Sequence, residues 1–197
     1  IHFPDTPINA EKARERFEFE ELFLELLKVE KRRDQWTRTL KGTPMAIKNT
    51  QINTLIASLP FKLTDSQQKA VQEILKDTEN KHPMNRLLEG DVGTGKTIVA
   101  LIIAYNTHLN GYKSLYMAPT EILAKQHFET FKTLLEPTGV KISLITGSNK
   151  PETDDYDILI GTHALIYSKE KFSKIGFVVI DEQHRFGVEQ RGKILDL

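Results

Sequence analysis

The sequence predicts an α/β protein with a mostly parallel sheet. Beyond Pro60, short apolar runs alternate with stretches of helical periodicity. The run Phe177–Ile180 is apolar at every position, which is typical of a strand buried on both faces. Strands separated by crossover helices form right-handed βαβ units, so we expect helices on both faces of the sheet.

The predicted strands are the short apolar runs of this region, namely Arg86–Leu88, Ser114–Ala118, Lys141–Ile145, Ile158–Ile160 and Phe177–Ile180. The predicted helices lie between them, at Ser66–Lys76, Lys96–Asn110, Glu121–Leu135 and in a short segment from His163. Gly111, and Pro137 with Gly139, supply the residues that commonly end helices.

A different pattern precedes Pro60. From Ala10 to about Gln35, apolar residues such as Phe19, Leu22 and Phe23 follow the spacing of one helix face, which predicts a long amphipathic helix. A shorter helical stripe, Ile52–Leu59, ends at Pro60. We therefore expect a helical linker over residues 1–60 that packs on an α/β domain over residues 61–197.

The composition narrows the functional classes. The 197 residues are 39% hydrophobic and include no cysteine, which excludes a disulfide scaffold and cysteine-ligated metal, and agrees with a cytoplasmic location. The longest apolar run, Ile98–Ala104, is far shorter than the ~18 residues of a membrane-spanning helix, so no membrane partner is expected. The 27 Lys and Arg residues balance 27 Asp and Glu residues, so nucleic-acid binding must depend on a local surface.

A phosphate-binding loop is the strongest local signal. Its GxxxxGK[ST] pattern lies between a predicted strand and a predicted helix and comprises Gly90, Asp91, Val92, Gly93, Thr94, Gly95, Lys96 and Thr97. The glycines let backbone N–H groups converge on one anion at the positive end of the helix. We expect Lys96 to reach the β and γ phosphates and Thr97 to bind Mg²⁺. A glycine-rich turn with a solvated lysine is the alternative.

Two carboxylates, Asp181 and Glu182, follow the last predicted strand. Because ligands collect at the carboxyl ends of parallel strands, we expect Asp181 to face the same Mg²⁺ as Thr97. Glu182 then orients and deprotonates the attacking water. An ordinary helix N-terminus is the alternative. The hypothesis requires Lys96 and Asp181 to lie on the same side of the molecule.

Phe61 and Gln67 lie just before the helix that precedes the loop. The planar amide of Gln67 matches the adjacent donor and acceptor of adenine, and Phe61 can pack on the ring. A helix cap at Thr64 or Ser66 is the simpler interpretation, and the two roles are compatible.

These motifs resemble the motor of superfamily 2 helicases. The resemblance extends to Ala118–His127, Ile145–Ser148, Gly161–Leu165 and Asp181–Val188. Within the superfamily, the segment Met84–Gly93 is most similar to the DNA helicases that remodel stalled replication forks and branched recombination intermediates. The motors of the transcription-repair coupling factor and the primosomal helicase are also similar, but Thr120–Leu123 and the pair Gln183-His184 favour the fork-remodelling group.

The resemblance implies a RecA-like lobe that binds ATP and Mg²⁺. In it, Lys96, Asp181 and Glu182 are implied to be catalytic, with Thr97 and Asp181 at the metal. Gln67 is implied to bind adenine, and Gln183 and His184 to relay the nucleotide state to a partner lobe. The residues implied to grip the DNA backbone are Pro119, Thr120, Glu121, Thr162 and His163. From the residues alone, a strand-end turn at Pro119-Thr120 and a helix cap at Thr162 are favoured.

The implied function is that of a motor lobe that couples ATP hydrolysis to replication fork reversal and Holliday junction branch migration, with branched DNA as its partner. The helical segment before Pro60 resembles the connection to a fork-binding wedge domain. We expect that domain and the second RecA-like lobe to be absent from this chain, truncated shortly after Asp181-Glu182-Gln183-His184, and the chain alone to be nearly inactive. The alternatives are the motor of a coupling factor, a small-molecule phosphotransferase, and a non-catalytic module that interacts through the Ala10–Gln35 helix.

Overall fold

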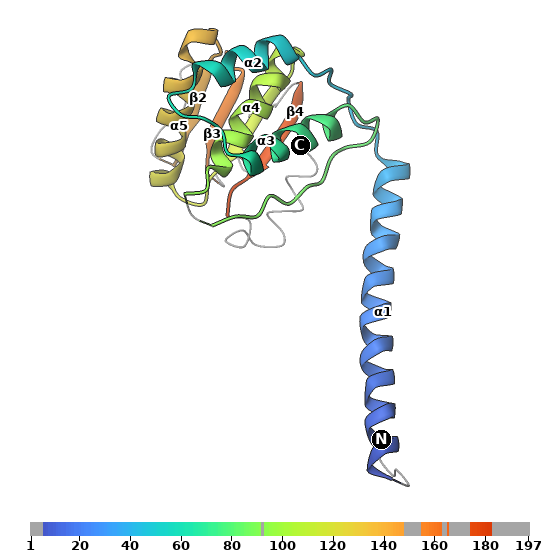
Figure 1. Ribbon diagram of the computed structural model, residues 1–197. Coiled ribbons are helices and arrows are strands. Elements are labelled where there is room, and N and C mark those ends of the chain that lie inside the picture. Colours follow the sequence, from blue (N-terminus) through green and yellow to red (C-terminus); the bar gives the residue numbers. More distant parts are fainter. Residues whose placement is uncertain (1–5, 92, 148–154, 163–164, 166–173, 183–197) are drawn as a thin grey trace. The chain divides into compact units, whose positions relative to one another are not determined.

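The computed structural model describes residues 6–91, 93–147, 155–162, 165 and 174–182 (Figure 1). The chain divides into two compact units, Ile1–Gly42 with Lys81–Met84, and Thr43–Asn80 with Asn85–Leu197. Residues 43–60, which the sequence places in the linker, fall in the second unit. There the N–H of Met45 donates to the carbonyl of Thr78 over 2.9 Å.

The first unit contains the long helix α1 (Pro7–Thr39), which includes and extends the predicted helix at Ala10–Gln35. Ion pairs one turn apart line its surface, including Arg16–Glu20 at 2.6 Å. The apolar side chains of the predicted face are exposed: Phe19 is 65% and Leu22 61% exposed. No helix in the described part of the chain is both long and apolar enough to span a membrane.

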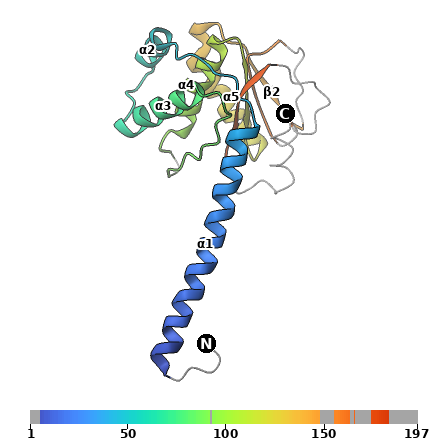
Figure 2. The same cartoon turned by 90° about the vertical axis from the view of Figure 1, so that its right-hand side faces the viewer.

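The helices of the second unit confirm the sequence prediction to within a few residues. They are α2 (Asn49–Ser58), α3 (Asp65–Thr78), α4 (Lys96–Leu109) and α5 (Glu121–Leu135). The short 3-10 helix η1 (Glu136–Thr138), which the sequence did not predict, follows α5. α2 and α3 pack against α4, outside the sheet (Figures 1 and 2). Because α4 is covered in this way, all of its residues from Ile98 to Thr107 are buried.

The sheet is parallel throughout its described strands, as predicted. The strands are β1 (Lys113–Met117), β2 (Ile142–Ile145), β3 (Ile158–Gly161) and β4 (Ile175–Ile180), in the order β2-β3-β1-β4. Every neighbouring pair runs in the same direction. The strands therefore place all their carboxyl ends at one edge.

The predicted strand at Arg86–Leu88 is wrong, because the structure forms no strand there. Leu87 is 67% exposed, and the guanidinium of Arg86 pairs with Asp77 and Glu73 of α3 at 2.6 and 2.9 Å. A strand needs a ladder partner and a buried face. In the described part of the chain this segment has neither.

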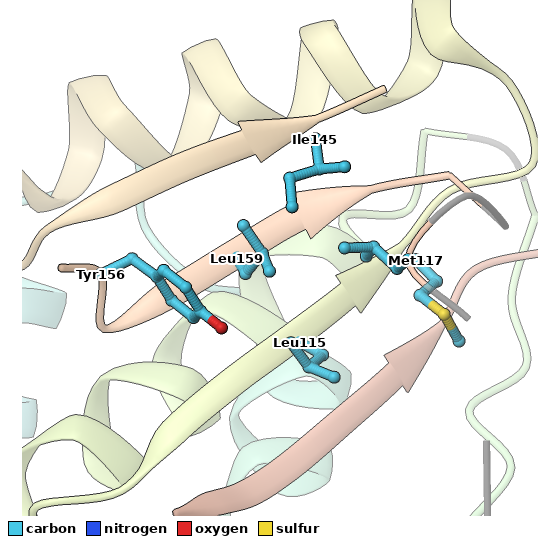
Figure 3. Close-up of a cluster of buried hydrophobic side chains, with 6 residues drawn as sticks. Leu115, Met117, Ile145, Tyr156 and Leu159 are labelled. Carbon is cyan, nitrogen blue, oxygen red and sulfur yellow. The ribbon is translucent and has the colours of Figure 1, made fainter. Parts of the chain in front are cut away.

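The two faces of the sheet carry different side chains. Leu115 and Met117 of β1 join Ile145, Leu159 and Tyr156 in a buried cluster (Figure 3). Tyr116 lies between the first two and points to the opposite face, since side chains alternate along a strand. There its ring packs on α5. The expected short helix from His163 lies outside the described residues.

Candidate functional site

The described residues of the loop, Gly90, Asp91 and Gly93–Gly95, form a turn before α4. Gly93 and Gly95 have φ values of 82° and 80°, in the left-handed region that favours glycine. The hydroxyl and N–H of Thr94 donate to the carbonyl of Asp91, at 2.8 and 3.3 Å, and close the turn. The positive end of α4 therefore faces the loop, an arrangement that favours an anion.

The Lys96 ammonium folds over this loop. Its Nζ donates to the carbonyl oxygens of Gly90 and Asp91, at 2.6 and 2.9 Å. Its positive charge also contributes to a lowered pKa of Asp181, at the end of β4. Lys96 is thus close enough for its charge to act on the Asp181 carboxylate, and the hypothesis that the two residues form one site stays a prediction.

Gln67 connects α3 to the loop. Thr64 is the N-cap of α3, and its side chain and that of Gln67 form a capping box. The amide of Gln67 also donates from Nε2 to the carbonyl of Thr94 over 2.8 Å. Nearby, Phe61 is 44% exposed, so its ring is available for stacking.

β4 ends in the two predicted carboxylates. The N–H of Asp181 donates to the carbonyl of Met117 over 2.8 Å and continues the β1–β4 ladder. Glu182 has a φ of 50°, a conformation that costs non-glycine residues about 1–3 kcal/mol and is often found at functional sites. A hydrogen bond from His127 lowers the pKa of Asp181, as do the N–H of Glu182 and the charge of Lys96, while burial opposes them. Asp181 is therefore an ionised acceptor at neutral pH.

Tyr116 of β1 lies between Asp181 and the first turn of α4. Burial of the phenol raises the pKa of Tyr116, as does the charge of Asp181, whereas a hydrogen bond with the Thr97 side chain lowers it. The Asp181 side chain also faces the Tyr116 phenol. Thr97 and Asp181 are thus both neighbours of one phenol oxygen.

The residues of the predicted DNA-binding motifs follow the carboxyl ends of β1 and β3. Thr120 is the N-cap of α5, and its hydroxyl accepts from the N–H of Leu123 at 3.3 Å. A Cβ on Gly147 would lie 2.9 Å from the Glu121 carboxylate, so these two segments approach each other closely. Thr162 is only 3% exposed, whereas Thr120 is exposed and Pro119 and Glu121 are partly buried.

Four predicted site residues lie outside the described residues, namely Val92, His163, Gln183 and His184. Sequence reasoning missed two that the structure brings to the site, Tyr116 and His127. The only available signal was their position in or next to the motif that begins at Ala118. Local spacing does not relate His127 to Asp181, because they are 54 residues apart.

The oxygen donors at this edge suit Mg²⁺. The Thr97 hydroxyl and the Asp181 carboxylate are hard ligands, both beside Tyr116. No cluster of three or more metal-ligating side chains occurs among the described residues. The Thr97 hydroxyl and the Asp181 carboxylate are the kind of donor set expected for an ion that keeps several waters and contacts one or two protein oxygens while it binds nucleotide phosphates.

The chain belongs to the DEAD/DEAH box helicase family, whose model matches residues 64–197. It is 41% identical over 204 residues to the ATP-dependent DNA helicase RecG of Bacillus subtilis (strain 168). It is also 40% identical over 206 residues to the RecG protein of Thermotoga maritima. The matches cover 98% and 100% of this chain but only 30% and 26% of those relatives.

Solved structures agree with the sequence matches. A structure of RecG bound to a three-way DNA junction aligns with a TM-score of 0.80 and 39% identity, covering 94% of this chain and 27% of that one. The UvsW helicase from bacteriophage T4 aligns with a TM-score of 0.60 over 78% of this chain and 57% of that one, but its 19% identity shows the fold alone. The motifs resemble those of superfamily 2 helicases and, within that superfamily, those of RecG. The sequence and structure comparisons confirm this resemblance.

Proposed function

We propose that this chain is the ATP-binding motor lobe of a RecG-type DNA helicase, which couples ATP hydrolysis to the remodelling of branched DNA. The observation that carries the proposal is the Lys96 ammonium folded over the loop that precedes α4, together with Asp181 directly after β4 at the carboxyl edge of one parallel sheet. Forks and Holliday junctions are the proposed substrates of the full-length protein. The similarity to RecG over nearly the whole chain supports the choice of a DNA helicase over other ATPases.

The phosphate-binding loop holds the triphosphate in this proposal. Its backbone N–H groups and the N-terminus of α4 bind the phosphates, and Lys96 leaves the carbonyls of Gly90 and Asp91 to reach the β and γ groups. Gln67 hydrogen-bonds to adenine and Phe61 packs on it. The loop therefore changes its internal hydrogen bonds when ATP binds.

The carboxylates act on the γ phosphate and on water. Thr97 and Asp181 hold Mg²⁺, which when bound neutralises charge on the phosphates. Glu182 orients the attacking water and takes its proton. Gln183 and His184, which follow directly in the sequence, relay the nucleotide state to a second lobe.

The segments at the ends of β1 and β3 grip DNA. Thr120 and Glu121 at the start of α5, with Pro119, Thr162 and His163, contact the sugar–phosphate backbone, which positions a strand without reading its sequence. A second RecA-like lobe closes over ATP and opens after hydrolysis, so that each state holds DNA differently. The residues before Pro60 connect the lobe to a wedge domain that engages the fork.

DNA-stimulated ATP hydrolysis and fork unwinding by the full-length gene product test this function. The wild-type protein is expected to hydrolyse ATP faster with a synthetic fork than without DNA. Lys96→Ala should abolish both activities, and Lys69→Ala, at an exposed lysine of α3, should retain them. Hydrolysis that is unaffected by DNA, or by Lys96→Ala, would refute the proposal.

A further inference from the structure

His127 of α5 contacts the carboxylate that ends β4. Its Nε2 lies 3.0 Å from Oδ2 of Asp181, and the two side chains are only 12% and 19% exposed. An ionised carboxylate only accepts hydrogen bonds, so the ring nitrogen carries the proton and donates it. The contact therefore fixes one oxygen of Asp181.

Tyr116 holds the imidazole in place. The two rings lie 4.9 Å apart with a 50° tilt, and Phe131, one turn further along α5, packs edge-on against the same tyrosine at 5.4 Å. The Tyr116 side chain also interacts with both Thr97 and Asp181. His127 is thus part of a packed connection between α4, β1, β4 and α5.

The same helix begins at two of the proposed DNA-gripping residues, Thr120 and Glu121. α5 begins at Glu121 immediately after Thr120, and His127 lies about 9 Å further along the helix axis, at about 1.5 Å per residue. A helix is stiff over two turns, so a shift of its first turn on DNA is transmitted to His127. The helix whose His127 contacts Asp181 is then also the helix that holds DNA in the proposed function.

We propose that His127 is a positioning residue that couples DNA binding to the nucleotide site by holding the Asp181 carboxylate from helix α5. This inference rests on the proposed function and adds the route of its regulation. DNA that seats the first turn of α5 sets the position of His127, and His127 sets the carboxylate that receives the metal. By reciprocity, nucleotide binding at Asp181 changes the affinity of α5 for DNA by the same factor.

A second histidine–aspartate pair provides a matched control. His108, near the end of α4, lies 3.1 Å from Asp157, just before β3. These side chains are 29% and 28% exposed and lie at the amino edge of the sheet, opposite the phosphate-binding loop. Loss of this pair removes a comparable contact without touching the site.

The test compares His127→Gln, His127→Asn and His108→Ala in the full-length gene product. The amide nitrogen of glutamine reaches about as far from the backbone as Nε2, whereas that of asparagine reaches only as far as Nδ1. Both variants keep a polar amide, so they differ mainly in reach. The first readout is the affinity for a fork, measured in the presence and in the absence of Mg²⁺ together with a non-hydrolysable ATP analogue. The second is the affinity for the analogue without Mg²⁺. The third is kcat and KM for ATP.

His127→Asn is expected to lower kcat for ATP on the order of 10- to 100-fold, as for other groups that orient metal ligands. It should also remove the effect of the analogue on fork affinity, while the affinity for the analogue without Mg²⁺ and the KM stay near wild type. His127→Gln should restore most of both losses, and His108→Ala should behave as wild type.

Two results would overturn the role of His127. One is a wild-type coupling between analogue and fork in His127→Asn; the other is an equal loss in His127→Asn, His127→Gln and His108→Ala, which marks a general loss of packing. Failure of the proposed function is a different observation, because the wild-type protein itself would then show no DNA-stimulated hydrolysis, and the role of His127 would fall with it.

Discussion

The side-chain amide of Gln67 bridges to Thr94: its Nε2 donates to the Thr94 carbonyl over 2.8 Å, while its Oε1 accepts from the N–H of Thr64 at 2.9 Å. Both ends of the amide are therefore used within the protein. An adenine base that hydrogen-bonds to Gln67 must share or replace one of these contacts. If Gln67 binds adenine as proposed, base recognition and the conformation of the loop before α4 are coupled at this residue.

Replacing Thr64 and Gln67 separates the cap from base recognition. Thr64→Ala should lower the free energy of unfolding by about 1 kcal/mol, because it removes an N-cap side chain, and should leave ATP affinity nearly unchanged. Gln67→Ala should weaken ATP binding about tenfold, or about 1.4 kcal/mol. Urea unfolding and nucleotide titration measure the two effects. Equal losses of ATP affinity in both variants would show that Gln67 acts only as a cap partner.

The loop glycines provide a matched pair. Gly93→Ala and Gly95→Ala both place a side chain at a positive φ, which costs roughly 1–2 kcal/mol. A Cβ at residue 93 meets nothing within 4 Å, whereas at residue 95 it would lie 2.3 Å from Nε2 of Gln67. Gly95→Ala should therefore lower ATP affinity more than Gly93→Ala does. Titrations in which Gly93→Ala has the larger effect would contradict this account of the loop.

Glu182→Gln tests the proposed general base. The amide keeps the size of the side chain but takes no proton, so hydrolysis should fall by roughly 10²–10⁴-fold while ATP still binds. Rapid filtration measures how much unhydrolysed ATP the full-length gene product retains. Glu129→Gln, at an exposed position of α5, is the control. Wild-type turnover in Glu182→Gln would remove Glu182 from the catalytic role.

Acid should destabilise the fold partly through Asp181. The hydrogen bond from His127 lowers the pKa of Asp181 in the folded state, so this group stabilises the fold above its ordinary pKa. That stabilisation is lost as the pH falls through the folded value, below about pH 4. Asp181→Asn should flatten the pH dependence of the unfolding midpoint in this range. If the unfolding midpoint of the variant depended on pH as steeply as that of the wild type, the ionised Asp181 carboxylate would not stabilise the folded state.

The secondary structure was predicted correctly where signals within a few residues, such as a helix cap and regular apolar spacing, are enough to define an element. α5 begins at Glu121, as predicted, because Thr120 caps a helix whose apolar spacing is regular. The strand at Arg86–Leu88 is absent because apolar content does not supply a ladder partner. Arg86 instead pairs with acids on α3.

The sequence alone determined the α/β class, the parallel strands and the glycine-bearing loop before α4, because periodicity, caps and motif spacing act within a few residues. Only the tertiary structure brought His127 to Asp181 and placed Tyr116 between the loop helix and the acidic strand end. Such contacts depend on strand order and helix packing, which join residues distant along the chain. A proton donor on an acid 54 residues away has no local signature.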